Sequence, residues 1–161
     1  MRRTLLVFSA LLLLAGPADA APSAPGFRVT TLDGRTIDSN GLIGQKIIVL
    51  RFQASYCKPC VKESAALAQV AEKYRDRGVE VIAIHVQDAT SDVHAFVEKT
   101  KATYPVALDP RLNLGNRFGF RGTPYTVVID RKGEMVARVH CAGAVRRLPR
   151  TLEGLLKQNK P

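Results

Sequence analysis

The stretch ASYCKPCVKE, residues 54–63, places two cysteines two residues apart between an apolar run and a helical pattern. The run before it, residues 47–52, predicts a buried strand because short, nearly continuous apolar runs are typical of strands covered on both faces. Beyond the cysteines, apolar residues recur at helical spacing and predict one helical face: Val61, Ala65, Ala68 and Ala71. Leu67 and Tyr74 flank this face. The cysteine pair is therefore expected where a buried strand passes into the N-terminus of a helix.

This position favours redox chemistry at Cys57. Unpaired backbone N–H groups and the positive end of the helix dipole stabilise a thiolate at a helix N-terminus. Lys58 adds a neighbouring cation, and the φ angle of Pro59 suits the first helical turn. Cys60 then falls one turn further along. The spacing fits a two-step exchange in which Cys57 attacks and Cys60 resolves the mixed disulfide.

Four other roles are the alternatives for this cysteine pair. A permanent structural disulfide would close a very short loop and contribute little entropic stabilisation. A closed zinc site needs four ligands, and only Cys141 and three histidines remain, without a second paired motif. A copper chaperone could use both soft thiolates together with a histidine. A peroxidase would usually have a threonine where Ala54 stands.

The rest of the chain alternates strand and helix patterns. Asp33-Gly34, within residues 27–37, lies between two short alternating runs and predicts a hairpin. Further strands are expected at 79–86, 104–108, 125–129 and 135–140, and helices at 91–101, 111–118 and 148–156. This order predicts an α/β fold, a central mixed sheet flanked by helices on both faces, with an N-terminal β-hairpin.

The first residues carry the pattern of a secretory signal peptide. Arg2 and Arg3 precede an apolar run from Leu5 to Ala15, and Ala18-Asp19-Ala20 has the form of a cleavage site. The run is shorter than the roughly 20 residues of a membrane-spanning helix, although an uncleaved anchor is the alternative. We expect a signal peptide at 1–20, one domain at 21–161, and export to the periplasm or the outer face of a bacterial cell membrane.

Charge and cysteine count limit the other function classes. The chain has a formal net charge of +10, which favours acidic partners, but its basic residues are dispersed and not interleaved with aromatic residues. We therefore expect no nucleic-acid partner. The odd third cysteine, Cys141, is expected to be a small buried side chain at the end of the last strand, with a regulatory or intermolecular thiol as the alternative. His85 is expected to be a satisfied core residue.

A second motif, Gly122-Thr123-Pro124, stands directly before the strand YTVVID. A proline that leads into a strand is compatible with a cis peptide bond in a tight turn. An ordinary trans-proline at the start of the strand is the alternative.

These segments together resemble an exported, TlpA-like member of the thioredoxin superfamily. The resemblance rests on VLRFQASYCKPCVKE, VIAIHVQDA, YPVALDP and GFRGTPYTVVIDRKGEMVARV, and covers roughly residues 26–157. It implies a thioredoxin fold in which Cys57 is the nucleophile, Cys60 the resolving thiol and Pro124 a cis-proline facing them. The backbone of Thr123 would pair with a substrate peptide, to which Tyr56, Lys58 and Pro59 would add contacts.

The resemblance also implies a function and partners. The protein would be a monomeric thiol-disulfide oxidoreductase, a reductant of cell-envelope proteins that include apocytochromes c, with no cofactor beyond the Cys57–Cys60 disulfide. A membrane electron donor of the DsbD or CcdA type would recharge it. Asp88, after the second strand, would take the proton from Cys60 as a general base, and a helix-capping or solvated carboxylate is the alternative. Two positions depart from the family pattern, since Tyr56 replaces a tryptophan and Ser64 and Ala65 follow Glu63 where the family has a proline.

Overall fold

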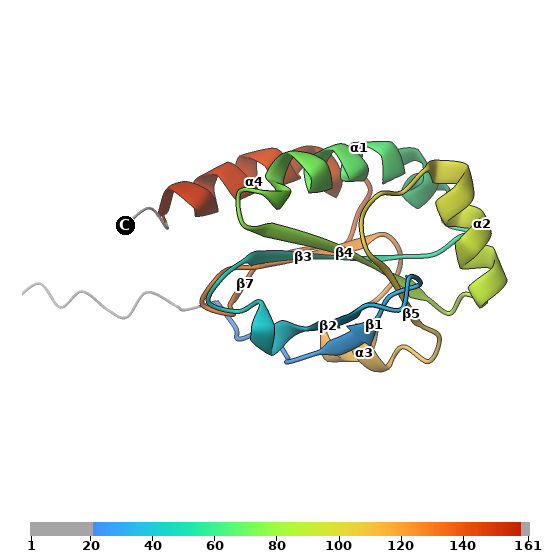
Figure 1. Ribbon diagram of the computed structural model, residues 1–161, viewed down its shortest axis with the longest axis horizontal. Helices are drawn as coiled ribbons and strands as arrows, with labels where there is room; N and C mark the ends of the chain where they lie inside the picture. Colours follow the sequence, from blue (N-terminus) through green and yellow to red (C-terminus); the bar gives the residue numbers. More distant parts are fainter. Residues whose placement is uncertain (1–20, 159–161) are drawn as a thin grey trace, which may run out of the picture.

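The computed structural model describes residues 21–158 (Figure 1). The predicted signal peptide lies outside these residues. In chain order the elements are β1 (Arg28–Thr30), β2 (Thr36–Asp38), a 3-10 turn (Ser39–Gly41), β3 (Ile47–Gln53), α1 (Lys58–Arg75), β4 (Val79–Val86), α2 (Thr90–Thr100), β5 (Val106–Asp109), α3 (Asn113–Arg117), β6 (Tyr125–Ile129), β7 (Met135–Val139) and α4 (Ala144–Gln158). Within 21–158, no helix combines the length and apolar character that a bilayer crossing requires.

The central sheet has five strands in the order β5-β4-β3-β6-β7. β3 runs parallel to β4, and β4 runs parallel to β5, whereas β6 and β7 are antiparallel to their neighbours. Every residue of β3 is buried, as expected for a central strand covered on both faces. The predicted mixed sheet is confirmed.

Helices α1, α2 and α4 cover one face of this sheet, and the β1–β2 hairpin and α3 cover the other (Figure 1). One buried cluster joins β3 and β4 to α1, α2 and α4, through side chains such as Leu67 and Leu152. The other joins the opposite face to the β1–β2 hairpin and α3, through side chains such as Ile37 and Leu114. The predictions of helices on both faces and of an N-terminal hairpin are confirmed.

The buried face of α1 differs from the predicted one. Ala65 is exposed, while Ser64, Leu67 and Tyr74 are buried on the sheet side. The large side chains occupy this face because they remove far more apolar surface from water than alanine does. Leu67 and Tyr74 are therefore central to the buried face, not beside it.

The last helix also begins earlier than predicted, at Ala144 instead of Leu148. Val145 and Leu148 are both buried and extend the apolar face formed by Leu152 and Leu155. Pro149 lies inside this helix, where the sequence suggested a helix start. Tertiary packing of the apolar face therefore outweighs the local preference of proline for the first turn.

The sheet topology brings three loops to one edge. Gln53 at the end of β3 pairs in register with His85 near the end of β4. Tyr125, the first residue of β6, lies opposite Phe52 on the other side of β3. The loops that carry the cysteines, Asp88 and Pro124 therefore emerge at the same end of the sheet, where ligand groups gather in α/β proteins.

Candidate redox site

The two cysteines form a disulfide at the N-terminus of α1. Cys57 is the N-cap residue, and Cys60 lies in the first turn, with a Cα–Cα distance of 5.2 Å. The backbone N–H of Cys60 points at Cys57 Sγ, with an N···S distance of 3.3 Å. Cys57 is 6% exposed and Cys60 is 1% exposed. The sulfur of Cys57 therefore meets an unpaired helix N–H, the group expected to stabilise its thiolate.

The residues around the disulfide differ in exposure. Tyr56 is 66% exposed, and Lys58 and Pro59 are also exposed. An apolar ring of this size on the surface is unusual because aromatic side chains are normally buried at least in part. Tyr56 therefore offers an apolar contact surface next to Cys57.

The Thr123–Pro124 peptide bond is cis, and both residues line a hollow shared with Pro59. Tyr125, the next residue, is fixed on both sides. Its hydroxyl donates a hydrogen bond to the carbonyl of Phe118 at 2.7 Å, and its ring stacks on His140 with centroids 3.7 Å apart. The fold thus brings the proline loop beside the turn that carries the cysteines.

Asp88 is buried and belongs to a different part of this edge. Its carboxylate accepts hydrogen bonds from the backbone N–H and the hydroxyl of Ser55, both at 2.7 Å. The same carboxylate accepts a third from His85 Nδ1 at 2.7 Å. Among residues 21–158, no hydrogen bond joins Asp88 to either cysteine. Asp88 therefore anchors the loop that leads into Cys57.

His85 is fully buried, as expected, and links Asp88 to the sheet. Its Nδ1 donates to Asp88, so its Nε2 accepts from the side-chain amide of Gln53 at 2.9 Å. Burial lowers the pKa of His85, and the hydrogen bond to Asp88 only partly opposes this. Burial therefore disfavours the charged ring, and the two hydrogen bonds satisfy both nitrogens of the neutral one.

A buried ion pair that the sequence patterns did not predict lies beneath α1. Arg51, in the middle of β3, has a side chain only 1% exposed, and its guanidinium pairs with the carboxylate of Glu63. It also donates to Thr126 Oγ1 at 2.8 Å, while Glu63 accepts from the N–H of Gly143. Burial lowers the pKa of Arg51, and Glu63 opposes that shift.

A signal for this pair was present in the sequence. Arg51 interrupts the apolar run IIVLRF, and a buried charge requires a partner. Glu63 stands one helical turn after Cys60, on the same α1 segment. The pair ties β3, the active-site helix and the loop before α4 together near the disulfide.

The expectation for Cys141 was wrong. This cysteine is a free thiol on the surface, in the loop between β7 and α4, where it lines the same hollow as Pro124. Its strand is at the edge of the sheet and ends at Val139, so the core does not extend to residue 141.

We expect Ellman's reagent to detect one thiol in the oxidised native protein and three after reduction and denaturation. Cys141 supplies the first, and the disulfide protects the other two. Cys141→Ser should remove the native signal entirely. A native signal that persists in this variant would show that the disulfide is open in the oxidised sample.

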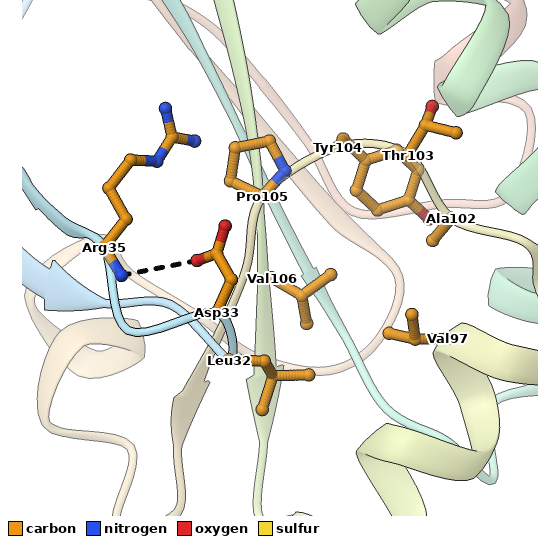
Figure 2. Close-up of a pocket in the computed structure, with 9 residues that line it drawn as sticks. All are labelled: Leu32, Asp33, Arg35, Val97, Ala102, Thr103, Tyr104, Pro105 and Val106. Carbon is orange, nitrogen blue, oxygen red and sulfur yellow. Dashed lines mark hydrogen bonds between the residues drawn. The ribbon is translucent and has the colours of Figure 1, made fainter.

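A separate pocket of about 260 Å³ lies between the hairpin and β5 (Figure 2). Its lining consists of Leu32, Asp33, Arg35, Val97, Ala102, Thr103, Tyr104, Pro105 and Val106. It contains no thiol and is distinct from the hollows beside the cysteines. Within the described part of the chain, no three His, Cys, Asp or Glu side chains are placed to hold a metal ion together.

Fold and site together define a thioredoxin-fold protein with a dithiol–disulfide pair at a helix N-terminus. Residues 20–138 match the model of the AhpC/TSA family. The chain belongs to this family, and within it to the thiol-disulfide oxidoreductases.

Three relatives illustrate the similarity. The thiol-disulfide oxidoreductase ResA of Halalkalibacterium halodurans is 31% identical, over 87% of this chain and 78% of its own. A thiol:disulfide interchange protein of Chlorobium tepidum superposes with a TM-score of 0.77 at 27% identity, over 86% of this chain and 99% of its own. A secreted Mycobacterium tuberculosis disulfide oxidoreductase, homologous to E. coli DsbE, gives a TM-score of 0.71 at 25% identity, over 80% of this chain and 96% of its own.

Proposed function

We propose that the protein is exported and reduces disulfides of cell-envelope proteins through Cys57 and Cys60. The observation that carries this proposal is the disulfide at the N-terminus of α1, beside a hollow that Pro59 shares with Thr123 and Pro124. That arrangement supplies an activated thiol, a second thiol within reach, and a neighbouring surface for a substrate.

The proposed reaction has two steps, attack by Cys57 and resolution by Cys60. The Cys57 thiolate attacks one sulfur of the substrate disulfide, forming a mixed disulfide and releasing the other substrate sulfur as a thiolate. Cys60, as its thiolate, then attacks Cys57 Sγ, which re-forms the Cys57–Cys60 bond and releases the second substrate thiolate. Two electrons pass from the dithiol to the substrate. In this scheme the backbone of Thr123 pairs with the substrate chain, and Tyr56 contacts it.

Export and direction rest on the leader pattern at residues 1–20 and on the family likeness. A secreted relative supports the location, and the TlpA-like sequence supports reduction, with apocytochromes c among the substrates. A membrane donor of the DsbD or CcdA type would return electrons to the disulfide. The alternative is a copper-binding module in which the reduced cysteines and a histidine hold Cu(I).

The reduction potential of the purified domain tests the direction. A reductant is expected near the value of thioredoxin, about −270 mV, while an oxidant would lie near that of DsbA, about −120 mV. A value close to the second would overturn the proposed direction. Copper that stays bound at one equivalent after dialysis of the reduced protein would favour the alternative.

For Asp88 we propose a positioning role in place of the proton transfer suggested by the sequence, because Ser55 and His85 already engage its carboxylate. Asp88→Asn is expected to lower the free energy of unfolding by about 1–3 kcal/mol, since one buried donor loses its acceptor. Stopped-flow kinetics should then show that attack and resolution both slow. Slowing of resolution alone between pH 6 and 8 would restore the general-base hypothesis.

A further inference from the structure

Two adjoining hollows form one groove beside the disulfide. The first, of about 500 Å³, lies between the start of α1 and the start of α4. The second, of about 450 Å³, lies between Pro59 and the proline loop. Pro59 and Ala142 line both hollows, so the two hollows adjoin at the active-site turn. An extended chain segment that followed both hollows would pass over Pro59, in the turn between the two cysteines.

The charged side chains of this groove are nearly all cationic. Four exposed basic residues line it: Lys58, Lys62, Arg121 and Arg146. Within residues 21–158, none of these four forms an ion pair with a carboxylate. The acid of the lining is Glu63, whose carboxylate is already engaged by Arg51 and by the N–H of Gly143.

Some other basic residues of the surface are neutralised by neighbouring carboxylates. Arg28, Lys46 and Arg77 are also on the surface, yet each pairs with a carboxylate. Like charges gathered along one groove repel each other and raise the local concentration of anions. The groove is therefore complementary to a negatively charged occupant.

We propose that this groove binds a protein segment that carries carboxylates on either side of its redox-active cysteine. The inference rests on the proposed function and specifies its substrate class. Carboxylates of the segment would face Lys62 and Arg146 in the first hollow and Arg121 in the second. Pro59 and Ala142, both exposed, supply an apolar contact surface between the two hollows.

Synthetic peptides test this directly. Two peptides would each carry one cysteine as a mixed disulfide with 2-mercaptoethanol, flanked by glutamates in one and lysines in the other. Reduced Cys57 attacks the peptide sulfur and releases 2-mercaptoethanol; Cys60 then attacks Cys57, re-forms the disulfide and releases the peptide thiol. The second-order rate constant at low salt is expected to be about 10-fold or more higher for the glutamate peptide. The difference should shrink as NaCl rises to about 300 mM.

Charge-reversed variants locate the effect. Lys62→Glu combined with Arg146→Glu should lower the rate with the glutamate peptide by about 10-fold and raise the rate with the lysine peptide. Lys132→Glu is the matched control, since this exposed lysine lies in the turn between β6 and β7, at the opposite end of the sheet. It should leave both rates unchanged. If the double variant unfolds, Lys62→Glu alone should change both peptide rates in the same directions, by a smaller factor.

Equal rates for the two peptides at low salt would overturn the proposal, as would an equal effect of Lys132→Glu and the groove variants. If the groove variants lost binding to anionic phosphatidylglycerol vesicles while the peptide rates stayed the same, the groove would bind a lipid surface and not a protein segment. Reduction of the uncharged probe bis(2-hydroxyethyl) disulfide tests the proposed oxidoreductase function independently of the charged groove. Failure of the unmodified protein to reduce that probe would contradict the proposed function itself.

Discussion

Glu63→Ala is expected to lower the free energy of unfolding by about 3–5 kcal/mol, a large part of the stability of a domain of this size. The change leaves the Arg51 guanidinium, 1% exposed, with only the neutral hydroxyl of Thr126 as a side-chain partner. It also removes the acceptor of the Gly143 N–H. Urea unfolding of the oxidised protein measures the loss.

Two further variants make this test specific. Glu72→Ala removes an exposed carboxylate from the same helix and should change stability by no more than about 0.5 kcal/mol. The double replacement Arg51→Met with Glu63→Leu should recover much of the loss, because an apolar pair of similar size carries no desolvated charge. A loss below about 1 kcal/mol in Glu63→Ala would show that water reaches Arg51 in solution.

The cysteine variants should separate attack from resolution. Cys57→Ser is expected to reduce exchange with a peptide disulfide to the uncatalysed rate, because the serine hydroxyl is not ionised at neutral pH and Cys60 is buried. Cys60→Ser should retain attack and accumulate a covalent mixed disulfide with the substrate. Mass spectrometry under non-reducing conditions measures both outcomes.

Both cysteine variants belong in a Cys141→Ser background, since the exposed thiol of Cys141 would form adducts of its own. Cys141→Ser by itself is the reference, and its exchange rate is the baseline for both cysteine variants. Adducts that accumulate in Cys57→Ser and not in Cys60→Ser would reverse the two roles.

The sequence determined most of the fold and the position of the dithiol. The short apolar runs at β3 and β4 predict strands that are buried on both faces. The predicted bounds, 47–52 and 79–86, closely match the observed strands Ile47–Gln53 and Val79–Val86. The cysteine pair followed from local order alone, since a strand that ends just before a helix places Cys57 at the helix N-terminus. The proline motif could likewise be located from its place before β6.

Only the tertiary structure determined which side chains surround Cys57 and Cys60. The partners Arg51 and Glu63 are 12 residues apart and meet because α1 packs back over β3. Asp88 hydrogen bonds to Ser55, 33 residues away, because β3 and β4 run parallel and end at the same edge. The exposure of Cys141 depends on β7 being an edge strand. The sequence could show that Arg51 needs a partner, but not which one, because the partners lie on segments that only packing brings together. Local order therefore determines the reactive atoms, and the packing of distant segments determines their environment.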